Sequence, residues 1–426
     1  MSIKLGNIDV SYFKVGAADC SIYLGTTLVY SGGTPPTPHD YSQDYLTFRA
    51  TEDGTFSFSG SGSISANTLE YSVDSGSTWS TLQNSGTTPT VTSGNTILWK
   101  ASGLTISSIG IGKFSSTGQF EAEGNIMSLH FGDNFSGQTS LSGISNAFSY
   151  LFQGCTRLTT AENLVLLATT LANSCYSNMF SNCSSLTTAP ELPATTLADS
   201  CYYSMFYGCS GLTTAPSVLP ATTLAEGCYT NMFRRCTSLT TAPVLSATTL
   251  ADNCYSKMFY GCTSLTTTPV LSATTLADNC YSQMFLNCTS LTTTPVLSAT
   301  TLANYCCQEM FLNCTSLTTA PSVLPATTLA EGCYTNMFRN CSSLTTAPVL
   351  PATTLVNRCY SNMFRSCTSL NNITCLARDI SAQYCTTTWV QGVAANGIFT
   401  KAASMTGWTE GTSGIPSGWT VVDYSS

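Results

Sequence analysis

Charge is scarce along this chain. Only 8% of its 426 residues are Asp, Glu, Lys or Arg, against about 25% in an ordinary soluble domain. The surface must therefore consist mostly of Thr, Ser, Asn and Gly. The chain has 14 basic residues and a net charge of −8. This argues against nucleic acid as a partner, because affinity for phosphate comes largely from Lys and Arg.

Long apolar runs and catalytic motifs are also missing. No stretch approaches the ~18 apolar residues of a membrane span, and the start, MSIKLGNIDVSYF, lacks the basic and apolar regions of a signal peptide. The two histidines, His39 and His130, stand apart from any nucleophile motif, and Glu191, Glu226 and Glu331 are isolated carboxylates. We therefore expect no membrane span, no enzymatic activity and no cofactor.

What the chain does have is an internal repeat. Residues 251–276 read ADNCYSKMFYGCTSLTTTPVLSATTL, and the next 26 residues repeat them almost letter for letter. Such a period predicts a solenoid, in which each coil buries its apolar side against its neighbours. Degenerate units at 146–158 and 382–393 are expected to close the stack. The first cysteine of each unit recurs at steps of 26 or 27, at Cys175, Cys201, Cys228, Cys254, Cys280, Cys306, Cys333 and Cys359.

Each unit has a pattern typical of one helix and one strand. Cys254, Met258 and Cys262 are spaced four apart, which predicts one apolar helical face. Asp252 stands where an N-cap would lie, and Gly261 where a left-handed C-cap would end the helix. The following SLTT segment predicts a short strand that ends at proline. Each coil is therefore expected to contain a helix, a brief strand and a return.

The chain has 21 cysteines, most of them in C-x7-C pairs. Within a helix the two would lie about 12 Å apart, beyond the ~7 Å that a disulfide allows between Cα atoms. Equivalent cysteines on neighbouring helices would also be too distant, at ~8–10 Å. Zinc would need four converging ligands, and the repeats contain no histidine. We expect buried, reduced thiols that fill space, with some disulfides as the alternative and no metal site.

Paired threonines recur twice in each unit, in LTT and in ATTL. Ice-binding solenoids carry T-x-T ranks, which place both hydroxyls on one face. Adjacent threonines should diverge, so ice binding is not expected. The ranks predict either a plain solvated surface or a recognition strip for a protein or glycan. The candidate binding residues are Thr240, Thr241, Thr266, Thr267, Thr292, Thr293, Thr318 and Thr319.

Other segments flank the repeats. Residues 1–32 carry Gly6, Gly16 and Gly25, each before a β-prone stretch, and residues 33–45 form a Pro/Gly linker. Alternating residues over 46–131 predict a β-sandwich, in which Trp79 and Trp99 either fill the core or bind carbohydrate. The solenoid is expected over 132–394, and residues 395–426 are expected to cap it.

The CYSxMFxxCxSLTT core, as in Met284, Phe285, Cys288, Leu291 and Thr292, resembles the signature of BspA-like leucine-rich repeats of bacterial surface proteins and gut phages. The resemblance covers about residues 140–393. It implies an α+β chain: a small all-β N-terminal part followed by an α/β leucine-rich-repeat solenoid. The family is associated with adhesion and protein binding.

The first 32 residues resemble N-terminal segments of phage tail and capsid appendages, which dock to the virion. The two resemblances together predict a virion appendage, docked through residues 1–32, that binds a host-surface protein or glycan through its solenoid. A homotrimer would be usual for a fibre, although no heptads are present. A bacterial cell-surface adhesin is the main alternative, and a purely structural virion decoration protein is the second.

Overall fold

The computed structural model describes residues 3–5, 8–10, 12–15, 20–24, 27–31, 39–60, 69–82, 86–101 and 112–425. The chain forms two compact units, Met1–Tyr41 and Ser42–Ser426. Of the predicted linker, residues 33–38 lie outside the described residues. The residue ranges predicted for separate domains remain predictions, since residues 42–426 belong to one unit.

The first unit contains two antiparallel sheets. Strands β1 (Ile3–Leu5) and β2 (Ile8–Val10) pair with each other, and β3 (Tyr12–Val15), β4 (Cys20–Leu24) and β5 (Thr27–Ser31) form a three-stranded sheet. A strand follows each of the three recurring glycines, as the sequence predicts.

The second unit begins with two facing sheets. The strands are β6 (Leu46–Ala50), β7 (Phe56–Gly60), β8 (Leu69–Ser72), β9 (Ser80–Thr81), β10 (Thr96–Ala101), β11 (Gly112–Ser116) and β12 (Phe120–Asn125), after a short 3-10 helix η1 (Tyr41–Gln43). One sheet has the order β12-β6-β10-β8-β9, and β7 pairs with β11. Phe48 and Trp99 of the larger sheet pack against Phe114 of the smaller one, with ring centroids 4.9 Å apart in both pairs. The two layers therefore share one aromatic core.

Strand β12 joins this β region to the repeats. On one side it pairs antiparallel with β6, and on the other it pairs parallel with β13 (Leu158–Thr160) and β14 (Leu164–Val165). Between them lie a helix of four residues, α1 (Ser128–Phe131), and the 3-10 turn η2 (Gly132–Asn134). The larger sheet thus runs directly into the first coil, and a single hydrophobic core extends from Leu46 to Trp419.

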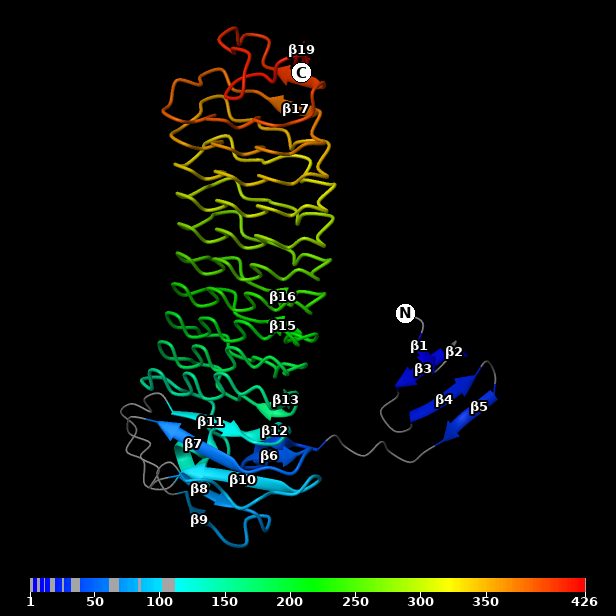
Figure 1. Cartoon of the computed structure of the whole chain (residues 1–426), viewed down its shortest axis with the longest axis vertical. Helices are drawn as coiled ribbons and strands as arrows, with labels where there is room; N and C mark the ends of the chain where they lie inside the picture. Colours follow the sequence, from blue (N-terminus) through cyan, green and yellow to red (C-terminus); the bar gives the residue numbers. More distant parts are fainter. Residues whose placement is uncertain are drawn as a thin grey trace. The chain divides into compact units, whose positions relative to one another are not determined.

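The repeats stack as the coils of a right column in Figure 1, but they contain no helix. Within residues 135–425 no segment is helical, so the helix predicted over Cys254–Cys262 is wrong. Met258 donates its N–H to the carbonyl of Tyr255 in its own coil (3.2 Å), whereas Phe259 donates to Met284 of the next coil (2.9 Å). This alternation continues along the segment. Among the described residues, no helix is long and apolar enough to cross a bilayer.

The helix prediction failed because four-residue turns give the same spacing as helical turns. Every fourth residue of the segment has a positive φ: Asn253 at 57°, Lys257 at 58° and Gly261 at 72°. Most of their equivalents are Asn, Gly or Ser, which adopt this left-handed conformation with least strain. Cys254, Met258 and Cys262 then face the core once in each turn, as residues four apart on a helix would.

The return segments form parallel ladders. Strands β15 (Val218–Leu219) and β16 (Val244–Leu245) pair in parallel, and single bridges continue the pattern, for example Leu271 with Leu297 and Thr293 with Thr319. The predicted strand after the second cysteine is reduced to these bridges. The predicted solenoid of 26- to 27-residue units is confirmed as a mostly β stack.

Identical aromatic residues stack in columns through the core. Phe259 and Phe285 have ring centroids 5.6 Å apart and an interplanar angle of 6°, and Tyr229 and Tyr255 are 5.6 Å apart at 8°. All four side chains are at most 2% exposed. Burial of one such ring stabilises the fold by about 2–3 kcal/mol, and the ring contact adds about 0.5–1.5 kcal/mol. The columns therefore hold the coils in register.

The second cysteine of each unit bonds to the preceding coil. The Sγ of Cys262 donates to the carbonyl oxygen of Phe233 at 3.0 Å, and the equivalent thiols make the same contact at 2.9–3.1 Å. Burial raises the pKa of the Cys262 thiol to about 12, so the thiol keeps the proton that it donates. The twenty described cysteines are free and buried. The distance argument against disulfides fell with the helix, but the packing role is what the structure shows.

The tyrosine column has one interruption. Cys307 takes the place of a tyrosine between Tyr281 and Tyr334 and is 1% exposed. A cavity of about 10 Å³, lined by these three residues and by leucines such as Leu297, marks the missing ring. The space suffices for about one water molecule, so the neighbouring side chains have closed most of the gap.

Each end of the stack is sealed by aromatic residues. At the first coil, His130 is 3% exposed and packs edge-on against Phe148 at 4.8 Å. At the other end Trp389 stacks on Tyr360 at 6.3 Å and on Trp408 at 5.6 Å. The last ladder consists of β17 (Asn372–Cys375), β18 (Ile398–Lys401) and β19 (Thr420–Asp423), paired in parallel.

Candidate binding surface

The eight threonines named from the sequence form two exposed columns. The first residue of each pair contributes to the stack: the hydroxyls of Thr266 and Thr318 donate to the carbonyls of Thr240 and Thr292, each at 3.2 Å. The second column, Thr241, Thr267, Thr293 and Thr319, is exposed as well. Its residues are better placed to reach a ligand, because no such inter-coil bond engages their hydroxyls. Their role in binding stays a prediction.

An exposed valine column runs along the same return segments and was not predicted. Val244, Val270 and Val296 are 62%, 74% and 75% exposed, and Val323 is 37% exposed. On alternate positions the same strands present serine and then threonine, as Ser272 and Thr274 do after Val270. The sequence signal was the PVLSAT segment, in which every second residue faces outward. We call the outward Val, Ser and Thr of residues 244–248, 270–274 and 296–300 the valine platform.

The platform has defined limits. The units before and after it are the 27-residue ones, which carry the extra residues Ser217 and Ser322. The valines of these two units, Val218 and Val323, are less exposed than the three between them. Beyond Val218 the column ends at Glu191, whose carboxylate accepts bonds from the N–H of Ser217 at 3.0 and 3.1 Å. The extra residue thus separates the platform from the rest of the column.

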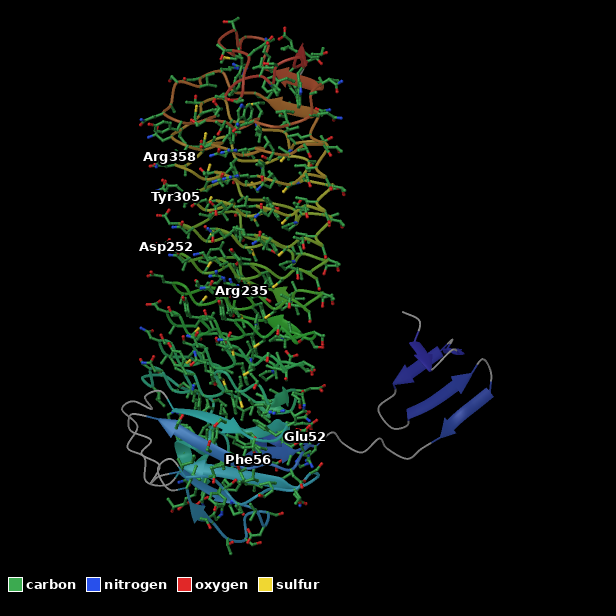
Figure 2. All side chains as sticks on the ribbon, in the orientation of Figure 1. Glu52, Phe56, Arg235, Asp252, Tyr305 and Arg358 are labelled. Atoms are coloured by element: carbon green, nitrogen blue, oxygen red, sulfur yellow. The ribbon has the colours of Figure 1, made fainter. Side chains whose placement is uncertain are left out.

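The turn segments present a different surface, with charges and tyrosines. Figure 2 shows Asp252, Tyr305 and Arg358 along one edge of the column and Arg235 away from that edge. The carboxylates there engage the backbone of the next coil: Asp252 accepts the N–H of Asp278 at 3.0 Å. These acids act in stacking the coils.

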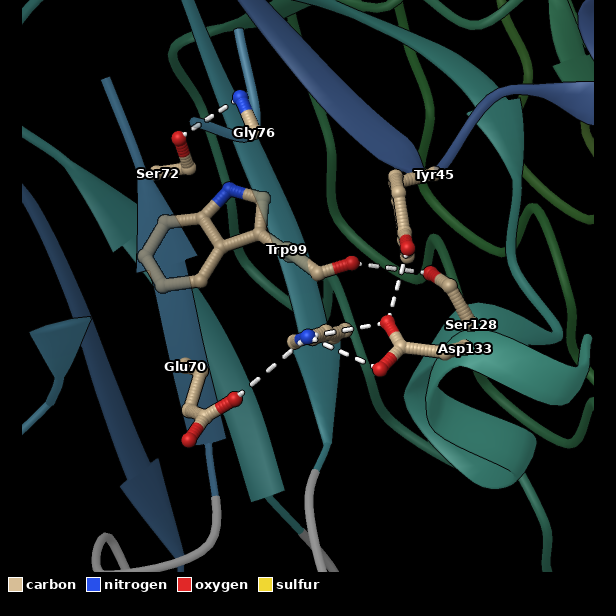
Figure 3. Close-up of polar contacts among 8 residues, drawn as sticks. Tyr45, Glu70, Ser72, Gly76, Trp99, Ser128 and Asp133 are labelled. Atoms are coloured by element: carbon tan, nitrogen blue, oxygen red, sulfur yellow. Dashed lines mark hydrogen bonds and ion pairs between the residues drawn. The ribbon is translucent and has the colours of Figure 1, made fainter. Parts of the chain in front are cut away.

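Trp79, the other candidate for carbohydrate binding, lies in a polar cluster of the β region. The ammonium of Lys100 lies 4.3 Å from the Trp79 ring centroid and 2.8 Å from Asp133. Asp133 also accepts the hydroxyl of Tyr45 at 2.7 Å (Figure 3). One face of the Trp79 ring is therefore covered by a cation, while Trp99 is fully buried in the core.

The thiols and histidine offer no catalytic arrangement in the described part of the chain. Burial raises the pKa of Cys254 to about 12 and lowers that of His130 to about 4, so neither is poised as nucleophile or base near neutral pH. Among the described residues, no three His, Cys, Asp or Glu side chains converge on a possible metal position. The surfaces are equipped for binding rather than for bond chemistry.

Comparison with known proteins agrees with the stacked repeats. The model of the BspA type leucine-rich repeat region matches in six copies, over residues 131–257, 206–345 and 306–385. These ranges span more than half of the chain. The chain belongs to this family. The repeat resemblance seen in the sequence is thereby confirmed, whereas the match does not reach residues 1–32, and their likeness to phage appendages has no support.

One solved structure is similar in part. It is the crystal structure of a leucine-rich repeat protein from Bacteroides ovatus ATCC 8483 at 1.19 Å resolution, with 16% sequence identity and a TM-score of 0.29. The similarity covers 64% of this chain and 86% of that one. A search of curated proteins gave no match.

Proposed function

We propose that this chain is a non-enzymatic adhesin of a bacterial cell surface, which binds a protein or glycan partner through its solenoid. The family membership supports this function over the virion appendage, which nothing in the comparisons favours. The observation that carries the proposal is the valine platform, because three valines more than 60% exposed in register form an apolar surface without a structural purpose in the monomer.

The mechanism is contact over an ordered face. Since the columns fix the coils before binding, the face loses little conformational freedom on association. Each coil contributes a weak contact, from a valine methyl and from serine and threonine hydroxyls. Contacts from successive coils sum along the stack.

Binding is tested by placing charge on the platform. In a triple variant, Val244, Val270 and Val296 are each replaced by Lys, and attachment of the purified chain to host-surface material is measured. We expect attachment to fall at least tenfold. The matched control replaces Thr237, Thr263 and Thr315 by Lys, which adds the same charge at other exposed positions of the coils. Equal loss in both variants would contradict a role for the platform.

Location is tested separately. Antibody labelling and protease shaving of intact producing bacteria should detect the chain at the cell surface. Mass spectrometry of purified phage particles should not detect it. Detection in virions together with absence from cells would overturn the adhesin proposal in favour of the appendage.

A further inference from the structure

A cluster of unpaired cations interrupts the otherwise acidic surface. Arg234, Arg235 and Lys257 belong to two consecutive coils, in a chain with 14 basic residues and a net charge of −8. Among the described residues, none of the three has a carboxylate within the 4.0 Å of an ion pair, although Arg358 and Lys401 elsewhere in the stack do. Their charge is therefore available to a ligand.

Tyrosines of the adjacent coils hold the two arginines in place. The guanidinium of Arg234 lies 4.4 Å from the ring centroid of Tyr260 in the following coil and 5.7 Å from that of Tyr207 in the preceding one. Its Nη1 donates to Asn231 at 3.3 Å. Nη1 of Arg235 donates to the hydroxyl of Tyr207 at 3.5 Å. Such contacts order both side chains, so less entropy is lost when an anion binds.

The surroundings suit a sugar ring. Tyr203 is 37% exposed, and its hydroxyl accepts the amide of Asn231 at 3.3 Å. Tyr207 and Tyr260 are partly exposed. Tyrosines of this kind offer an apolar ring face together with a polar tip, which matches the alternating C–H and hydroxyl surfaces of a pyranose. Guanidinium groups bind carboxylate or sulfate in a two-pronged geometry.

We propose that Tyr203, Tyr207, Arg234, Arg235, Lys257 and Tyr260 form a site for an acidic sugar of a host glycan. This acidic-sugar site rests on the proposed binding function and gives it a ligand class. The carboxylate or sulfate binds Arg234 and Arg235, while the sugar ring packs on a tyrosine. Lys257 adds attraction.

The ligand carries an isolated acid group rather than a run of them. The same turn segments bear Glu226, Asp252 and Asp278, two of which lie in the coils that supply the cations. A polyanion or acidic peptide extending across the coils would meet these carboxylates within about one Debye length, ~8 Å at physiological salt. A glycan with one acidic residue and neutral neighbours avoids that repulsion.

The chain contains a matched control. Residues 320–339 repeat residues 215–234 without a difference, so Arg339 has the same local sequence as Arg234. Around Arg339, however, Leu312 and Arg365 replace the two tyrosines and Asn340 replaces Arg235. Arg339→Gln should therefore remove the same charge without removing the site.

The test uses the full chain and biolayer interferometry. The probes are oligosaccharides that end in a uronic acid, a sulfated hexose or a sialic acid, each beside its neutral parent. We expect at least one acidic probe to bind at least tenfold more tightly than its parent, with affinity that falls as salt rises. Arg234→Gln and Arg235→Gln should each lower that affinity at least tenfold, Arg235→Lys less, and Arg339→Gln less than twofold. Thermal unfolding of each variant checks that the fold persists.

Three results would overturn the proposal: no preference for any acidic probe, equal loss in Arg339→Gln, or full competition by an acidic peptide. These outcomes are distinct from failure of the adhesin proposal. If the wild-type chain attaches to host surfaces and Arg235→Gln attaches equally, the acidic-sugar site is wrong and the adhesin stands. If the wild-type chain attaches to nothing, the adhesin proposal fails.

Discussion

The segments Ala215–Arg234 and Ala320–Arg339 have the same twenty residues but different surroundings. In the first, Tyr229 stacks on a tyrosine on each side, both at 5.6 Å. In the second, Tyr334 stacks only on Tyr360, at 6.1 Å, because Cys307 lies on its other side. The difference shows that a coil's stability and surface depend on its neighbours as well as on its own residues.

The phenylalanine column provides the largest test of this comparison, because it is complete in both segments. Phe233 lies 5.4 and 5.6 Å from its neighbours, and Phe338 lies 5.5 and 5.8 Å from its own. Phe233→Ala and Phe338→Ala should each lower the free energy of unfolding by about 3–5 kcal/mol. Urea denaturation should give the two losses within about 0.5 kcal/mol. A clear inequality would mean that the columns do not hold both coils alike.

The tyrosine column should respond unequally. Tyr229→Cys copies the natural interruption and should cost about 3 kcal/mol, since it removes a buried ring with two partners. The reverse change, Cys307→Tyr, should stabilise by only about 1 kcal/mol, the size of the ring contacts it restores. The cavity of about 10 Å³ shows that the neighbours have already closed in. Gains and losses of equal size in urea denaturation would contradict this asymmetry.

Acid should weaken the end of the column where the neighbour is not a repeat. Burial lowers the pKa of His130 from 6.5 to about 4, so the unfolded chain binds a proton that the folded chain refuses. Stability is then complete above pH 6.5 and falls as the pH drops toward 4. The loss from this group approaches about 3 kcal/mol.

Urea denaturation of the wild-type chain and of His130→Phe between pH 7 and 4.5 measures this term. Phenylalanine can pack on Phe148 without titrating, so the variant should lose less stability over that range. Parallel curves for the two proteins would show that His130 does not set the dependence.

The smallest expected effect separates the two threonine columns. Thr266→Val removes the hydroxyl bonded to Thr240 and should cost about 0.5–1 kcal/mol. Thr267→Val, one residue further, should leave stability nearly unchanged. Thermal denaturation of the pair decides this, and a larger loss in Thr267→Val would reverse the roles assigned to the columns.

The period and the stack could be predicted from the cysteine spacing alone, but the coil's local structure could not. Apolar residues four apart fit a helix and a series of four-residue turns equally well. The deciding signal was the residue between them: Asn253, Lys257 and Gly261 all adopt positive φ, and Asn or Gly recurs at these columns. A cap was inferred at Gly261, whereas three successive left-handed residues were needed.

The surface was predicted only in part. The threonine columns were visible because they repeat in every unit. The valine platform depends on which residues of PVLSAT face outward, and that follows from the register of the ladder. The acidic-sugar site combines side chains from coils 26 residues apart, such as Arg234 and Tyr260, and its members do not repeat. Neither could be assigned before the coils were placed on one another.

The central claim is that each unit is an interchangeable coil that needs only neighbours of the same kind. Removing residues 251–302, two whole units, tests this most directly. The account predicts a cooperatively folded chain whose stack is shorter by about 10 Å, at ~4.8 Å per coil, as measured by small-angle X-ray scattering. An unfolded or aggregated product, or a folded one of unchanged length, would contradict it.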